Sequence, residues 1–156
     1  MRSRSCADRG GDGRLTSDCV IDTSAWVRLR DPGVPGERLE AIADAIGEQR
    51  IWATTILLLE DGYSAHDAPA YHAAAELLGN LPFVELDADA SRRARDIQRQ
   101  LVRVGHHRMP PHDILTMAIA ETHRLGVLHY DRHFDVIRDH TDCLAATEWL
   151  VPRGSL

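Results

Sequence analysis

Short apolar runs alternate with helix-like patterns along this chain, and that order constrains the fold more than any other feature. Five runs have the length and composition of buried strands, at residues 20–22, 51–53, 83–86, 127–130 and 148–151. Capping residues and apolar residues at helical spacing fill the intervals between these runs. Strands separated by helices favour a parallel sheet with helices on both faces. We therefore expect a three-layer α/β/α fold around a central parallel sheet of four to five strands.

The clearest helix is predicted over residues 87–104. Its apolar residues recur at spacings of three and four and form one stripe, at Ala90, Ala94, Ile97, Leu101 and Val104. An opposing face carries Arg92, Arg95, Arg99 and Arg103. That face is either a solvated surface or a set of RNA phosphate contacts, and both interpretations stay open. Further helices are predicted over residues 39–47, 54–63, 70–81, 111–126 and 134–138.

Length and composition indicate one domain, because 156 residues suffice for a single hydrophobic core. Residues 1–18 are polar, aperiodic and rich in Gly and Arg, so we expect a disordered tail there. The domain is expected over 19–152, with a short tail over 153–156. No apolar run reaches the ~18 residues of a membrane span, and the N-terminus lacks the apolar segment of a secretory signal. The expected localisation is cytoplasmic, without membrane contact.

Charge and cysteine usage exclude some classes of protein. The formal net charge of −6 argues against a broad nucleic-acid-binding patch. It does not exclude a nuclease, because a bound divalent cation reverses the local sign of a carboxylate cluster. Three cysteines without CxxC spacing support neither a disulfide framework nor a zinc site.

Four acidic residues stand where a parallel sheet would bring them together: Asp22, Glu60, Asp113 and Asp131. Asp22 and Asp131 come at the ends of predicted strands, and ligands of open α/β sheets bind beyond the carboxyl ends of the strands. Each acid alone could be a helix cap or a solvated side chain, because the chain has 24 acids. Together they would supply oxygen ligands for Mg²⁺ or Mn²⁺. Metal-assisted hydrolysis of a phosphodiester is therefore the leading interpretation.

Four segments, in order, resemble the PIN domain: VIDTSAW at 20–26, LEDGYSA at 59–65, PHDIL at 111–115 and LHYDRHFD at 128–135. More narrowly, the chain resembles the VapC toxins of type II toxin–antitoxin pairs, and EWLVP at 148–152 is similar to that group as well. The resemblance covers about residues 20–152. It implies a PIN-like version of the three-layer fold.

The resemblance also implies a Mg²⁺- or Mn²⁺-dependent endoribonuclease that cleaves structured RNA, such as tRNA or rRNA, and so inhibits translation. It implies a cognate VapB-like antitoxin whose tail covers the acidic crevice, and a homodimer. By motif position, Asp22, Glu60, Asp113 and Asp131 correspond to the family's catalytic, metal-binding quartet. Thr23 or Ser24 would orient Asp22.

The chain departs from the family pattern at two positions. Many relatives carry Asp two residues after the fourth acid, and here that residue is His133, so a second metal ion is not implied. His133 and Asp135 are then expected around the metal ligands rather than among them. Asp61 adds a charge beside Glu60, and only one of the two should face the site because they point about 100° apart on a helix. The resemblance implies Glu60, which stands three residues before Tyr63 as in the family.

Two alternatives remain. A PIN fold can bind RNA or a protein partner without cleavage, but the complete quartet favours a nuclease. A nuclease of the same fold can instead mature RNA or act on DNA, but the short chain without an added domain favours the toxin.

Overall fold

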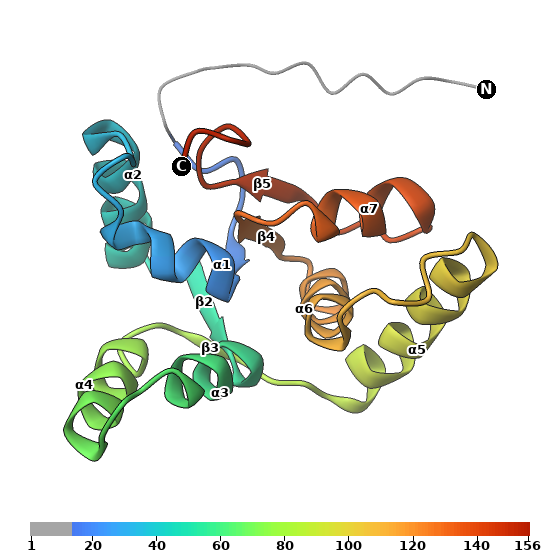
Figure 1. Ribbon diagram of the computed structural model, residues 1–156, viewed down its shortest axis with the longest axis horizontal. Helices are drawn as coiled ribbons and strands as arrows, with labels where there is room; N and C mark the ends of the chain where they lie inside the picture. The colour runs from blue at the N-terminus through green and yellow to red at the C-terminus, as the bar shows by residue number, and fades with distance from the viewer. Residues whose placement is uncertain (1–13) are drawn as a thin grey trace.

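A five-stranded, all-parallel sheet forms the centre of the molecule (Figure 1). The structure is a computed structural model, and it describes residues 14–156. The strands are β1 (Cys19–Ile21), β2 (Ile51–Thr54), β3 (Phe83–Val84), β4 (Gly126–His129) and β5 (Thr147–Trp149). Their order in the sheet is β3-β2-β1-β4-β5, and every neighbouring pair is parallel. The predicted parallel α/β architecture is confirmed, with five strands.

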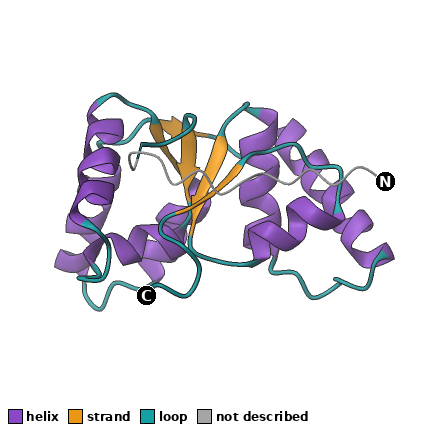
Figure 2. Ribbon diagram, turned by 90° about the horizontal axis from the view of Figure 1, so that it is seen from above, coloured by secondary structure: helices purple, strands orange, loops and turns teal. Residues whose placement is uncertain are grey.

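Helices cover both faces of this sheet, as Figure 2 shows. They are α1 (Thr23–Trp26), the 3-10 helix η1 (Val27–Arg30), α2 (Gly36–Gly47), α3 (Thr55–Tyr63), α4 (Ala68–Leu78), α5 (Ala88–Arg103), α6 (Pro111–Thr122) and α7 (His133–His140). The apolar side chains of α5, α6 and α7 pack together on one face, and those of α1 and α2 contribute to the cluster on the other.

The central strands divide the hydrophobic core into two layers, because successive side chains of a strand point to opposite faces. Val20 of β1 and Val127 of β4 belong to the layer beneath α5 and α6. Their neighbours Ile21 and Leu128 belong to the opposite layer, together with Ile42 of α2. Both faces are buried, which explains why these strands appear in the sequence as continuous apolar runs rather than alternating ones.

Several helix boundaries differ from the predicted ones, and α2, for example, begins at Gly36 rather than at residue 39. α6 ends at Thr122 rather than at 126, because Arg124 adopts a positive φ of 57° and Leu125 N–H donates to the Ala120 carbonyl at 2.8 Å. α4 begins and ends earlier than predicted, since the Asp67 carboxylate caps it by accepting from Ala70 N–H at 2.7 Å. α7 continues to His140, two residues beyond the predicted end at 138.

The predicted terminal tails are described only in part. Residues 1–13 lie outside the described part of the chain, so disorder there stays a prediction. Within 14–18, Leu15 is buried in the core and the Thr16 hydroxyl donates to Glu148 at 2.8 Å. At the other end, Leu156 N–H donates to the Tyr130 hydroxyl at 3.0 Å. Among the helices of residues 14–156, none has the length and apolar character needed to cross a bilayer.

Candidate active site

The four predicted acids line one crevice beyond the carboxyl ends of the central strands. Asp22 follows β1 directly and Asp131 lies two residues beyond the end of β4, its neighbour in the sheet. Glu60 comes from α3, and Asp113 comes from the first turn of α6. The crevice has a volume of about 450 Å³ and is also lined by Thr23, Ser24, Leu59, Tyr63, Ser64 and His112. Asp61, the acid beside Glu60, does not line it.

Hydrogen bonds from the start of α1 hold Asp22 in place. Its carboxylate caps the helix, accepting from Ser24 N–H at 2.8 Å and also from the Ser24 hydroxyl. The hydroxyl oxygen in turn accepts from Tyr130 N–H at 2.9 Å, which ties the end of β1 to the end of β4. Burial raises the pKa of Asp22, while the hydrogen bonds from Ser24 oppose that rise.

Glu60 is oriented by the neighbouring hydroxyl. The Thr23 hydroxyl donates to the Glu60 carboxylate across the crevice. The sequence predicted that either Thr23 or Ser24 would orient Asp22. In the structure the two adjacent hydroxyls serve different acids, Ser24 contacting Asp22 and Thr23 contacting Glu60.

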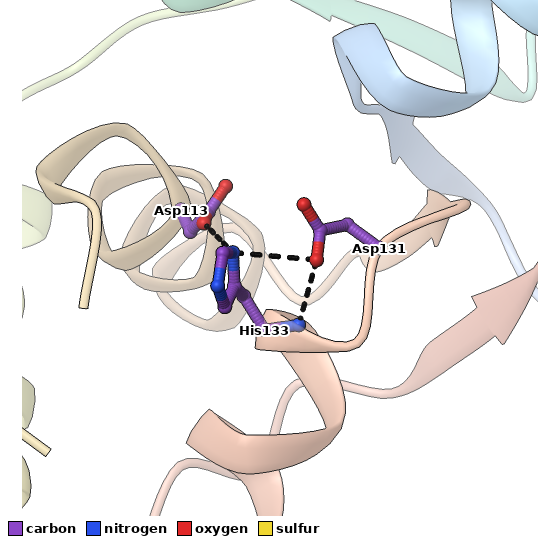
Figure 3. A group of neighbouring side chains, drawn as sticks. All are labelled: Asp113, Asp131 and His133. Atoms are coloured by element: carbon purple, nitrogen blue, oxygen red, sulfur yellow. Dashed lines mark hydrogen bonds and ion pairs between the residues drawn. The ribbon is translucent and has the colours of Figure 1, made fainter.

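Asp113, Asp131 and His133 form a tight cluster at the other side of the crevice, shown in Figure 3. His133 Nδ1 lies 3.0 Å from Asp113 Oδ2 and 3.3 Å from Asp131 Oδ1. The backbone N–H of His133 donates to Asp131 Oδ1 at 3.0 Å. Among residues 14–156, Asp113 Oδ2 and His133 Nδ1 have no hydrogen-bond partner, although both atoms are buried.

The environment of Asp113 disfavours its charged form. The residue is 2 % exposed, and burial is the main cause that raises its pKa from 3.8 to about 6. The charges of Asp22 and Asp131 act in the same direction, while His112 and His133 oppose it. A divalent cation beside Asp113 would remove this penalty, because it would compensate the buried negative charge.

His112 had no predicted role, although it lies between two of the acids. Its Nδ1 is 3.7 Å from Glu60 Oε1, and its Nε2 is 3.4 Å from Asp113 Oδ1. The only available signal was its position directly before Asp113. The sequence also gave no indication of the apolar rim, where Leu59 is 68 % exposed and Tyr63 is 93 % exposed.

A second hollow, which we call the basic groove, adjoins this cluster at His133 and has a volume of about 640 Å³. It lies between residues 105–109 and α7. Basic and histidine side chains dominate its lining: His106, His107, Arg108, Arg132, His133, Arg138, His140 and Arg153. Its two acids, Asp135 and Asp139, both pair with Arg138 at 3.0 Å. The side chains of Arg108, Arg132 and Arg153 form no hydrogen bond or ion pair with any described residue.

The structure does not bring the remaining predicted residues into the acidic crevice. Asp135 accepts from the Trp149 indole N–H at 3.1 Å and pairs with Arg138, which places it in the basic groove. The α5 arginines Arg92, Arg95, Arg99 and Arg103 line neither hollow. Two of them, Arg92 and Arg99, pair with acids of their own helix, Asp89 and Asp96.

The residues of the crevice fit a divalent cation. Asp113, Asp131 and His133 each present one ligand atom, and these atoms all lie within 4.8 Å of one another. Asp22 and Glu60 line the same crevice with two further carboxylates. A bound cation stabilises carboxylates that are buried or held close together.

Comparison with known proteins gives consistent matches. The model of the PIN domain family matches residues 19–139. The ribonuclease VapC18 of Mycobacterium tuberculosis is 37% identical over 140 residues, which are 87% of this chain and 97% of that protein. The ribonuclease VapC51 of the same organism is 35% identical over 137 residues, which are 88% of this chain and 96% of that protein.

Solved structures show the same fold. A DNA-bound VapBC from Salmonella typhimurium matches with a TM-score of 0.68 at 19% identity, over 86% of this chain and 99% of that one. VapBC2 from Rickettsia felis, bound to a promoter DNA fragment, matches with a TM-score of 0.65 at 14% identity, over 83% and 96% of the two chains. The PIN-like form of the predicted fold is therefore confirmed.

Proposed function

Since this chain belongs to the PIN domain family and, within it, to the VapC ribonucleases, we propose that it is the toxin of a VapBC-type pair, an endoribonuclease that hydrolyses RNA and so inhibits translation. The observation that carries the proposal is the convergence of Asp22, Glu60, Asp113 and Asp131 on one crevice from four separate elements. Carboxylates brought together in this way repel one another, so the arrangement favours metal-dependent chemistry over a structural role.

The quartet would hold Mg²⁺ or Mn²⁺, which polarises a phosphodiester and lowers the pKa of bound water. Ser24 and Thr23 keep Asp22 and Glu60 in fixed orientations. Water attacks the phosphorus in line, the bond to the 3′-oxygen breaks, and the products carry a 5′-phosphate and a 3′-hydroxyl. His112, which is half-exposed at the crevice, lies where it can transfer a proton to or from the reacting groups.

We place the path of the RNA backbone along the basic groove. Arg108, Arg132 and Arg153 line that groove without an acidic partner among the described residues, and guanidinium groups bind phosphates well. The α5 set of Arg92, Arg95, Arg99 and Arg103 remains an alternative contact surface. Structured RNA such as tRNA or rRNA is the proposed substrate class, by similarity to the VapC ribonucleases.

The proposed partner is a VapB-like antitoxin that covers the acidic crevice. Support comes from the similar solved structures, which are named as VapBC assemblies. The exposed side chains of Leu59 and Tyr63 add apolar surface at the rim, where a partner would bury it. A homodimer is proposed from the family resemblance alone.

A PIN fold that binds without cleavage is not favoured. The loss of one or more acids would be expected in such a module, whereas here all four are present and share one crevice. A nuclease that matures RNA has the same chemistry, and the similarity to VapC ribonucleases over most of the chain favours the toxin.

The test is inducible expression of the chain, followed by mapping of RNA 5′-phosphate ends across the transcriptome. We expect growth arrest and one dominant set of new ends, both absent for Asp22→Asn. Asp61→Asn is the matched control, because Asp61 neighbours Glu60 but does not line the crevice. Arrest and identical ends from the Asp22 variant, with folding confirmed by circular dichroism, would contradict the assignment.

A further inference from the structure

We propose that His133 is a direct metal ligand, and that its Nδ1 biases the site toward a first-row transition ion such as Mn²⁺ over Mg²⁺. The inference rests on the proposed function only for the presence of a divalent cation in the crevice. It goes further because the sequence analysis placed His133 around the metal ligands rather than among them.

The first support is the pair of buried atoms that face each other without a hydrogen bond. Asp113 Oδ2 and His133 Nδ1 are 3.0 Å apart, both are buried, and neither has a hydrogen-bond partner among residues 14–156. A buried polar atom left unpaired destabilises the folded state. A cation that accepts a lone pair from each atom would satisfy both at once.

The second support is the spacing of the three candidate ligand atoms. Two atoms that each lie about 2.1 Å from one metal ion are about 3.0 Å apart at a right angle and about 3.4 Å apart at the tetrahedral angle. The distances from His133 Nδ1 to Asp113 Oδ2 and Asp131 Oδ1 are 3.0 and 3.3 Å. These separations match the edges of a coordination shell without movement of the backbone.

The third support is the way in which the chain fixes the position of His133. The residue opens α7, and its backbone N–H donates to Asp131 Oδ1 at 3.0 Å. The main chain of His133 is therefore held beside the carboxylate with which the ring would share the ion. Figure 3 shows the ring directed into the space between Asp113 and Asp131 rather than away from it.

The chemical nature of the ligand atoms determines which ion the site prefers. Mg²⁺ is a hard cation that binds oxygen and keeps several of its waters, so an imidazole nitrogen contributes little to its binding. Affinity for nitrogen ligands rises along the first-row transition ions. A site with two carboxylate oxygens and one nitrogen therefore prefers a transition ion more strongly than a site made only of carboxylates.

The experiment measures metal binding directly, on the full chain without RNA. Mn²⁺ is titrated into the wild-type protein and followed by electron paramagnetic resonance, and pulsed measurements then detect ¹⁴N hyperfine coupling to the bound ion. Calorimetry gives the dissociation constants for Mn²⁺ and Mg²⁺. The test variant is His133→Asp, which restores an all-oxygen site. The control is His140→Gln on the same helix, whose ring contacts His106 rather than the acids.

We expect ¹⁴N coupling in the wild type and in His140→Gln, and none in His133→Asp. The ratio of the Mg²⁺ to the Mn²⁺ dissociation constant should fall by about tenfold in His133→Asp, because the nitrogen ligand is lost. Coupling that persists in His133→Asp, or a ratio that does not change, would overturn the proposal.

The outcomes also separate this proposal from the proposed function. If Mn²⁺ binds without ¹⁴N coupling and RNA is still cleaved, the assignment of His133 fails while the nuclease stands. If neither ion binds to the folded protein, both fail together.

Discussion

Asp22 and Asp113 are two buried carboxylates of the same crevice, and their surroundings differ in kind. Asp22 accepts two hydrogen bonds from Ser24, a residue of its own helix, so its orientation is set by the fold. Asp113 is at least as buried, yet its Oδ2 has no hydrogen-bond partner among the described residues and faces His133 Nδ1.

The two sides of the crevice therefore differ in how their carboxylates are stabilised. On the β1 side, a backbone and a hydroxyl donor hold the Asp22 carboxylate without any ligand, although burial raises its pKa as well. On the side formed by α6 and α7, burial and the charges of Asp22 and Asp131 raise the pKa of Asp113, and the nearby His112 and His133 oppose that rise only in part. A buried carboxylate oxygen of Asp113 lacks a hydrogen-bond partner among the described residues, at the place where an ion is proposed to bind. Unsatisfied groups of this kind are expected at functional sites.

The largest predicted effect follows from removing the Asp113 carboxylate. Asp113→Asn should lower the rate of RNA cleavage by about a thousandfold, on the order of 4 kcal/mol of transition-state stabilisation, because a proposed metal ligand is lost. The measurement is single-turnover cleavage of a structured RNA at saturating Mn²⁺. Asp61→Asn should stay within about twofold of the wild type. A cleavage rate for Asp113→Asn above about one tenth of the wild-type rate would contradict a role of Asp113 in binding the metal ion.

Asp113→Asn should increase the free energy of unfolding, and the size of this increase should depend on pH. Folded Asp113 keeps its proton up to about pH 6, while in the unfolded chain the pKa is near 3.8. The folded state therefore binds more protons between these values, so the wild type loses free energy of unfolding as the pH rises through them.

Asp113→Asn has no such loss, so the variant should be about 2 kcal/mol more stable than the wild type at pH 7 and nearly equal to it at pH 4. Urea unfolding in the presence of a chelator at the two pH values measures this difference. A difference that is the same at pH 4 and pH 7 would mean that burial does not destabilise the Asp113 carboxylate.

A smaller effect is expected from changing Ser24, which orients the proposed ligand Asp22 but would not itself bind the ion. Ser24→Ala removes the hydroxyl that donates to Asp22 and accepts from Tyr130 N–H. Cleavage should fall about tenfold and the free energy of unfolding by about 1–2 kcal/mol. Thr23→Val, which removes the donor to Glu60 instead, is the matched variant. Wild-type cleavage by Ser24→Ala would show that the orientation of Asp22 does not depend on this hydroxyl.

The smallest effect separates the two candidate RNA surfaces. In an Asp22→Asn background, Arg132→Gln and Arg153→Gln should each weaken tRNA binding by about threefold and reduce the salt dependence, because each removes one phosphate contact. Arg95→Gln and Arg103→Gln on α5 form the comparison pair. If the α5 substitutions weaken binding more, the α5 surface rather than the basic groove carries the RNA.

Strand and helix order were predictable because apolar runs and spacing are local properties of the sequence. The α/β class, the parallel sheet and most elements follow from residues such as Val20, Val127 and the stripe of α5. The order β3-β2-β1-β4-β5 was not predictable in this way, since it depends on which strands pair over long distances. The helix ends at Thr122 and Leu78 were missed because backbone turns after the helices override the apolar pattern.

The composition of the site was less predictable than its location. Strand ends pointed to Asp22 and Asp131, the family resemblance implied all four acids, and the structure brings the four to one crevice. The roles of neighbouring side chains depend on ångström-scale contacts that no spacing encodes. His112 lies between Glu60 and Asp113, His133 faces two carboxylates, and Thr23 serves Glu60 rather than Asp22.

The position of β4 between β1 and β5 also governs when such a protein can become active during its own synthesis. Asp22 is made early, but Asp131 and His133 follow 109 and 111 residues later. A ribosome adding about 5–20 residues per second needs about 5 to 20 s to cover that distance. Throughout that interval the nascent chain holds only an incomplete set of ligands. A partial chain that ends before Asp131 therefore lacks one of the four acids of the proposed site, and the crevice is completed only after β4 and the start of α7 have been made.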